Sequence, residues 1–146
     1  MPATMKTLNS IGRCQAMYRK KTISAENLCP NHYAFVLAVC YKPGRSQDEL
    51  AKALCLDKST VARALAHLEN HRYIVRLPNE KDRRQYLVHP TEKMLALYPK
   101  IQRNNVEWNA RLTENVSTEE LAVFHRVLSV MEQNAKKITD ELEVHE

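Results

Sequence analysis

The segment from Lys58 to Asn70 carries polar side chains whose types and spacing suit contact with DNA. Its apolar residues, from Val61 to Leu68, recur every three or four positions, which predicts a helix with one buried face. The opposite face offers hydroxyl groups near the positive helix end, suited to phosphate, and an arginine fork able to bond guanine O6 and N7 together. A solvated polar face is the alternative. The candidate DNA-contacting residues are Ser59 and Thr60 for phosphate, Arg63 as base reader, and Lys58 and His67.

Catalytic and cofactor chemistries lack their usual residue patterns in this chain. With only 2 glycines, Gly12 and Gly44, the sequence has no glycine-rich loop for phosphate. His67 and His71 have a spacing able to bind zinc, but no third ligand is near them in the sequence. None of the 4 cysteines forms a CxxC pair. The sequence therefore predicts no enzyme, no catalytic residue, no metal site and no cofactor.

Short elements on either side of this helix are predicted to position it. Ser46 and Glu49 form a capping box that opens a short helix, and Asp57 or Ser59 caps the helix that follows. Two short helices joined by so brief a turn cross steeply, as in a helix-turn-helix. Residues 73–77 and 85–88 then predict a β-hairpin, with the polar segment between them as a protruding loop. Together these elements predict a winged helix.

Long amphipathic helices are predicted outside this region. Apolar residues spaced alternately by three and four run from Leu121 to Leu142, and Ser117 with Glu120 forms a capping box before them. Further long helices are predicted from Met94 to Leu112 and from Lys6 to Ala25. A single chain of this length offers little to cover these seams, so we expect a second copy to do so. An intramolecular helical bundle is the alternative.

The charge distribution is compatible with a part that binds a polyanion and a separate solvated part, and a basic face that is only solvated is the alternative. The net charge is +5, with basic residues in excess before residue 94 and acidic residues in excess after residue 100. No apolar run is long enough for a transmembrane helix, and the N-terminus lacks the pattern of a secretion signal. We expect a soluble, cytoplasmic, nucleoid-associated protein without a membrane partner.

The sequence resembles the MarR family of bacterial and archaeal transcriptional regulators. The resemblance implies a mainly α (α+β) fold, with a winged helix-turn-helix DNA-binding domain at 28–91. Long N- and C-terminal helices, at 1–27 and 92–146, would form a dimerisation region. Two departures are Cys55 and Arg72, which stand where glycine is common. The segments that carry the resemblance are STVAR (59–63), HLEN (67–70), YIVR (73–76), NEKDRR (79–84) and TEK (91–93).

The resemblance also assigns site residues outside the helix predicted from Lys58 to Asn70, which corresponds to the recognition helix of the family. Arg83 and Arg84 lie in the loop that inserts an arginine into the minor groove, and Asp82 would brace one of them; which is braced and which is inserted stays open. Arg45 and Lys81 are expected on phosphates, as are Lys42 and Arg76, although Arg76 could instead form a structural ion pair. An effector pocket is implied between the two regions, with Tyr18, Arg19, His32 and Tyr33 as lining residues.

These observations predict a sequence-specific, DNA-binding transcriptional regulator. We expect a homodimeric repressor of a pseudo-palindromic operator on double-stranded DNA, released by a small aromatic or phenolic effector. A winged-helix protein–protein interaction module of a transcription assembly, an RNA binder and a cysteine-based redox-sensing regulator using Cys14 are the alternatives.

Overall fold

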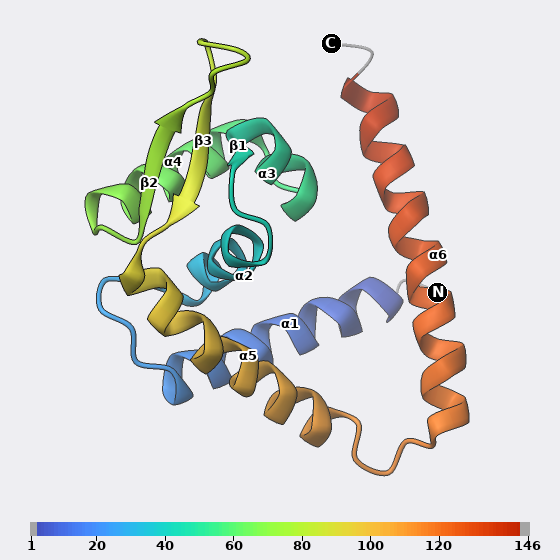
Figure 1. Cartoon of the computed structure of the whole chain (residues 1–146). Coiled ribbons are helices and arrows are strands. Elements are labelled where there is room, and N and C mark those ends of the chain that lie inside the picture. Colours follow the sequence, from blue (N-terminus) through green and yellow to red (C-terminus); the bar gives the residue numbers. More distant parts are fainter. Residues whose placement is uncertain (1–2, 144–146) are drawn as a thin grey trace. The chain divides into compact units, whose positions relative to one another are not determined.

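The computed structural model describes residues 3–143 (Figure 1). The chain divides into two compact units, with the boundary in the sequence between Trp108 and Asn109. The first unit holds a winged helix, confirming the predicted fold class. The described elements are α1 (Ala3–Thr22), a 3₁₀ turn η1 (Pro30–His32), α2 (Tyr33–Tyr41), β1 (Arg45–Ser46), α3 (Gln47–Leu54), α4 (Lys58–Asn70), β2 (Ile74–Pro78), β3 (Tyr86–Pro90), α5 (Glu92–Leu112) and α6 (Thr118–Glu143).

Side chains cap the helices where the sequence predicts them to begin. The Ser46 Oγ accepts from the Glu49 backbone N–H at 3.2 Å, and Glu49 Oε2 accepts from the Ser46 N–H at 2.7 Å. The same reciprocal pair opens α6, with Glu120 Oε2 accepting from the Ser117 N–H at 2.9 Å. Of the two candidates for α4, Asp57 is the cap. Each capping box satisfies two helix-end groups that would otherwise lack a partner.

Two helix ends close through left-handed residues that are not glycine. Cys55 after α3 has φ 53°, and Arg72 after α4 has φ 61°. At each end the next backbone N–H reaches back five residues, from Leu56 to the Ala51 carbonyl and from Tyr73 to the Leu68 carbonyl. This is the bonding pattern of a helix ending that usually has glycine in the left-handed position. Helix α4 therefore ends without glycine, because Arg72 itself takes the strained left-handed conformation.

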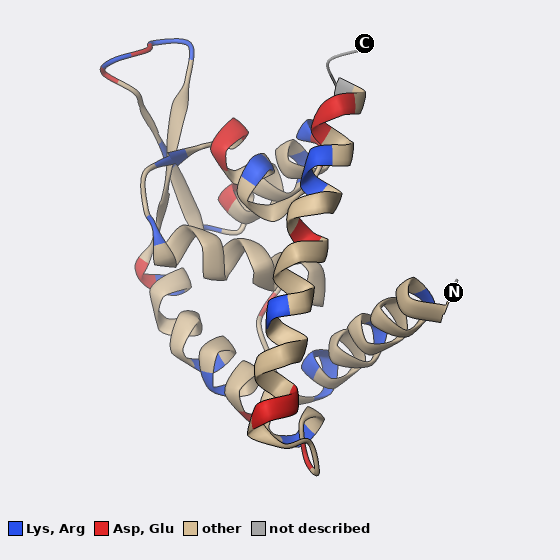
Figure 2. Cartoon of the chain, turned by 90° about the vertical axis from the view of Figure 1, so that its right-hand side faces the viewer, with Lys and Arg blue, Asp and Glu red and all other residues tan. Residues whose placement is uncertain are grey.

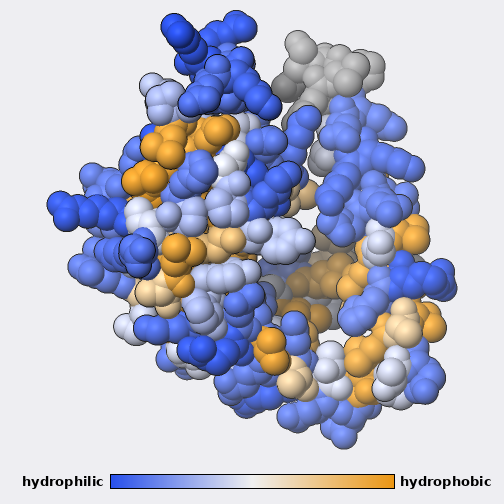
Figure 3. Space-filling view, in the orientation of Figure 1, coloured by the Kyte–Doolittle hydropathy of each residue, from blue (hydrophilic) through white to orange (hydrophobic). Residues whose placement is uncertain are grey.

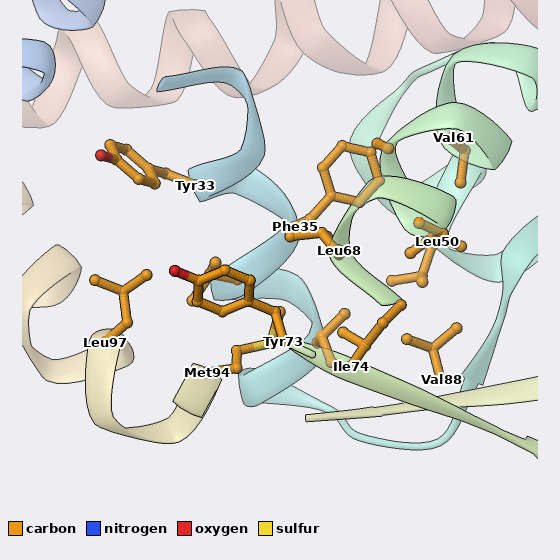
Figure 4. Packing of buried hydrophobic residues seen from close by; sticks show 14 of the residues in the cluster. Tyr33, Phe35, Leu50, Val61, Leu68, Tyr73, Ile74, Val88, Met94 and Leu97 are labelled. Carbon is orange, nitrogen blue, oxygen red and sulfur yellow. The ribbon is translucent and has the colours of Figure 1, made fainter. Parts of the chain in front are cut away.

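The wing is a three-stranded antiparallel sheet in the order β1-β3-β2. The hairpin of β2 and β3 is the predicted one, whereas the short β1 was not expected; it pairs Arg45 with Val88. Beneath the sheet, the predicted inner face of α4, from Val61 to Leu68, is buried against residues of α2, α3 and the strands (Figure 4). This packing fixes the angle at which α4 presents its opposite face.

The flanking helices of the first unit pack on one another. The α1 helix begins at Ala3 and ends at Thr22, three residues earlier at both ends than predicted, and a 3₁₀ turn leads into α2. Arg19 Nη2 donates to Asn105 Oδ1 at 2.7 Å, and the rings of Tyr18 and Trp108 lie 5.2 Å apart. These contacts attach α1 to α5.

The second unit contains α6, whose described residues are all partly or fully exposed. Phe124, Ile138 and Leu142 of the predicted seam are 47%, 59% and 66% exposed. Further hydrophobic side chains widen the apolar surface over the first half of the helix (Figure 3). In residues 3–143, no helix is long and apolar enough to cross a membrane.

Candidate nucleic-acid interface

Asp57 organises the N-terminus of α4. Its carboxylate accepts from the Thr60 backbone N–H at 2.8 Å and from the Ser59 and Thr60 hydroxyls at 2.6 Å each. These bonds, led by the one from Ser59, hold the pKa of Asp57 far below its usual range. Asp57 is therefore anionic near neutral pH. The hydroxyl protons that the sequence assigned to phosphate are given to Asp57 instead.

Arg63, the predicted base reader, lies exposed one turn further along α4. Its Nη2 donates to Thr60 Oγ1 at 3.2 Å, so the guanidinium is tied to the N-terminal turn of the helix. Lys58, another predicted contact, lies 3.4 Å from Asp48 Oδ1 in an exposed ion pair. An exposed pair of this kind contributes little to stability, and both cations stay accessible to a polyanion.

His67 lies in a row of three imidazoles. Its ring stacks on His32 with centroids 4.6 Å apart and contacts His71 with centroids 4.5 Å apart, and its Nε2 lies 2.5 Å from the Asn27 carbonyl oxygen. These contacts join α4 to the segment before α2. Within residues 3–143, no cluster of histidine, cysteine or acidic residues is arranged to hold a metal ion.

In the wing loop, Asp82 contacts Arg84 and not Arg83. Asp82 Oδ1 accepts from the Arg84 backbone N–H at 3.1 Å and lies 3.6 Å from Arg84 Nε. Arg83 is exposed beside it, and in the described part of the chain no hydrogen bond or ion pair holds its side chain. Lys81 is also exposed on this loop, where the charged residues gather at the tip (Figure 2). Asp82 thus braces Arg84 and leaves Arg83 to extend.

The other predicted phosphate contacts have different environments. Arg76 Nε lies 3.3 Å from Glu69 Oε2 and its side chain is 25% exposed, so Arg76 forms the structural ion pair that was the alternative. Arg45 is half-buried on β1, and Lys42 is exposed just before it. Lys42 is the more accessible of these cations.

A cavity of about 700 Å³ lies between α1, the η1–α2 segment and α4. Of the predicted pocket residues, Arg19 and His32 line it. Tyr33 is instead buried in the core with 2% exposure, and Tyr18 packs on Trp108. The remaining lining residues are Gly12, Gln15, Ala16, Cys29, Pro30, Asn31, Ala34, Phe35, Leu54, Leu56, Thr60, Arg63, Ala64 and His67.

Two features of this cavity bear on function. Its described lining includes two guanidinium groups and two imidazoles but neither an aspartate nor a glutamate. Burial, with smaller effects of His67 and His71, lowers the pKa of His32 and favours a neutral ring. The sequence prediction missed Thr60 and Arg63 as lining residues. The helical spacing of Gly12, Gln15 and Arg19 could have indicated the α1 side, but no local signal indicated the α4 side.

Comparisons with known proteins agree with this geometry. Residues 27–85 match the model of the MarR family. The uncharacterized HTH-type transcriptional regulator YybA of Bacillus subtilis is 29% identical over 112 residues, which cover 74% of this chain and 75% of YybA.

Solved structures extend the likeness beyond the matched segment. A MarR transcriptional regulator from Methanosarcina mazei Go1 is 28% identical with a TM-score of 0.85, covering 94% of this chain and 99% of that one. A MarR family regulator from Listeria monocytogenes, solved with 26mer DNA, shares the fold at 23% identity and a TM-score of 0.81, covering 94% and 89%. In sequence over residues 27–85 and in fold over most of its length, the chain is similar to MarR-family transcriptional regulators.

Proposed function

We propose that this chain is a transcriptional regulator of the MarR type, a homodimeric repressor that binds a pseudo-palindromic operator and is released by a small-molecule effector. The match of residues 27–85 to the MarR family model and the likeness to an HTH-type transcriptional regulator support a DNA-binding regulator rather than an enzyme. The observation that carries the proposal is that α4 presents Arg63 outward while the wing presents Arg83 and Arg84 from a separate loop of the same unit. The Listeria regulator with this fold was solved with DNA, which supports the same use here.

The proposed DNA contacts divide between base reading and backbone positioning. Arg63 reads a base pair in the major groove, where its fork can bond guanine. Arg83 enters the minor groove, and Arg84 contacts the backbone in the orientation that Asp82 gives it. The residues proposed to follow phosphates are Lys42, Arg45, Lys58 and Lys81. Ser59, Thr60 and His67 act through the position of α4 and Arg63, because their polar atoms already bond within the protein.

The exposed apolar face of α6 supports a dimer. Large side chains such as Phe124 and Leu142 are about half exposed or more within one chain, and continuous apolar surface of this kind marks an interaction site. We assign residues 1–27 and 92–146 to dimerisation and residues 28–91 to DNA binding. Two copies would place two recognition helices about one DNA turn apart, roughly 34 Å.

The cavity is the proposed effector site. Its cationic and apolar lining, with Arg19, Arg63 and Phe35, suits a small aromatic or phenolic anion. Arg63 lines this cavity and also belongs to the proposed DNA-reading face. An anion bound there attracts the same guanidinium that a guanine would bond, so effector and operator oppose each other.

Two measurements test this proposal. Genomic fragments bound by the purified protein should, on sequencing, share a pseudo-palindromic site. Light scattering at micromolar concentration should give twice 16.9 kDa. A stable monomer that unfolds cooperatively, or bound fragments without a shared sequence, would contradict a dimer that reads DNA with two α4 helices. Sequence-indifferent DNA binding would instead favour a protein–protein interaction module.

A further inference from the structure

A chain of hydrogen bonds leads from Arg63 to the N-cap of its own helix. Arg63 Nη2 donates to Thr60 Oγ1 at 3.2 Å, and Thr60 Oγ1 donates to Asp57 Oδ2 at 2.6 Å. A hydroxyl has one proton and two lone pairs. Because Thr60 gives its proton to the carboxylate, its lone pairs are left for the guanidinium. The order of donors and acceptors therefore runs in one direction only.

Asp57 is held in place at both of its oxygens. Oδ1 accepts from the Thr60 backbone N–H at 2.8 Å and from Ser59 Oγ at 2.6 Å, while Oδ2 accepts from Thr60 Oγ1. A carboxylate with these partners cannot rotate without losing bonds. A hydroxyl that donates to an anion is also a stronger acceptor, since hydrogen bonds in a chain polarise one another.

We propose that Thr60, fixed by Asp57, is a positioning residue that sets the direction of Arg63 and so the base preference of α4. This inference rests on the proposed function, in which Arg63 reads a base pair. A free arginine side chain loses rotamer freedom when it binds, whereas one already tied to its helix loses less. The cost of the arrangement is a negative charge at the helix end that faces the DNA, which weakens binding to every sequence. The arrangement favours discrimination over affinity.

The test compares two substitutions of Thr60 that differ in the hydroxyl. Thr60→Val keeps the branched shape and removes the hydroxyl, and Thr60→Ser keeps the hydroxyl. The full-length protein first selects its operator from random duplexes. Dissociation constants are then measured on that operator, on duplexes with each base pair changed in turn, and on a scrambled duplex. Arg63→Ala identifies the base pair that Arg63 reads, and thermal melting shows that each variant is folded.

The wild type should discriminate about 5- to 150-fold at the Arg63 base pair, the range for one bidentate contact. Thr60→Val should reduce this to about threefold or less, while affinity for scrambled DNA changes less than about twofold. Thr60→Ser should retain the discrimination. Asp57→Asn, which removes the anion, should relax the same base pair and tighten binding to scrambled DNA; unchanged values for both would overturn the inference.

The remaining outcomes separate a failure of the positioning role of Thr60 from a failure of base reading by Arg63. Full discrimination by Thr60→Val, or equal loss by Thr60→Val and Thr60→Ser, would overturn the positioning role. Weaker binding of Thr60→Val to operator and scrambled DNA alike would mean that Thr60 contacts phosphate directly, which also overturns it. If Arg63→Ala relaxes no base pair, the base-reading role itself fails. If Arg63→Ala relaxes one base pair and Thr60→Val does not, only the positioning inference fails.

Discussion

Replacing Asp82 in the wing loop should weaken DNA binding, whereas replacing Glu80 in the same loop should not. Asp82 contacts Arg84 through both the backbone N–H and Nε, whereas Glu80 is an exposed carboxylate of the same loop. Asp82→Ala and Glu80→Ala each remove one negative charge close to the DNA, which by itself favours binding. Only Asp82→Ala also releases a guanidinium, so the difference between the two variants isolates the brace.

The size of this difference follows from exposure. The Arg84 side chain is 94% exposed, and exposed ion pairs contribute about 0.2–1 kcal/mol. Two wings in a dimer double this, so the dissociation constant of Asp82→Ala should exceed that of Glu80→Ala by about 2- to 30-fold at low salt. Fluorescence anisotropy with a labelled operator measures both constants.

A double-mutant cycle sharpens the test. When Arg84 is already alanine, Asp82→Ala should have the same effect as Glu80→Ala, because no guanidinium is left to release. Equal dissociation constants for Asp82→Ala and Glu80→Ala in the presence of Arg84 would refute the brace. An undiminished difference between them in the Arg84→Ala background would place the effect of Asp82 elsewhere in the loop.

Three further predictions concern stability and sensing. Cys55→Gly and Arg72→Gly should each raise the free energy of unfolding by about 0.5–1 kcal/mol, because glycine relieves the left-handed strain, and Cys55→Ala should not; thermal melting checks this. The pKa of His32 is lowered in the folded protein, which therefore binds fewer protons than the unfolded chain, so stability should fall as pH drops below about 6.5. Urea titrations at several pH values give the free energy of unfolding, which should fall less with decreasing pH in His32→Asn than in the wild type. An equal fall in both proteins would count against His32 as the source of the pH dependence. Each of the four cysteines, replaced singly by serine, should leave operator binding intact, and release of wild-type protein from DNA by peroxide would contradict that expectation.

Local sequence signals predicted the elements that position α4. The Ser46–Glu49 and Ser117–Glu120 boxes depend only on residues three apart, so they could be identified without knowledge of the fold. The left-handed ends at Cys55 and Arg72 were visible as departures from glycine, although the sequence could not say that these residues would take the same conformation.

Contacts between distant segments could not be predicted in the same way. Thr60 and Arg63 line the same cavity as Arg19, which stands more than forty residues earlier in the sequence. Tyr33 was assigned to the pocket by resemblance, but the rotation of α2 in the core turns it inward. Both Asp57 and Ser59 were plausible caps, and only the geometry shows that Ser59 donates to Asp57.

A salt titration of Arg63→Ala on operator and scrambled DNA tests the central claim most directly. Base reading by Arg63 predicts a loss on the operator of about 1–3 kcal/mol per half-site, with little change on scrambled DNA. Arg83→Ala, the matched removal of a wing cation, should weaken both DNAs more evenly and lower the salt slope by about one per lost phosphate contact. Equal weakening of both DNAs by Arg63→Ala, with both unchanged by Arg83→Ala, would contradict the account.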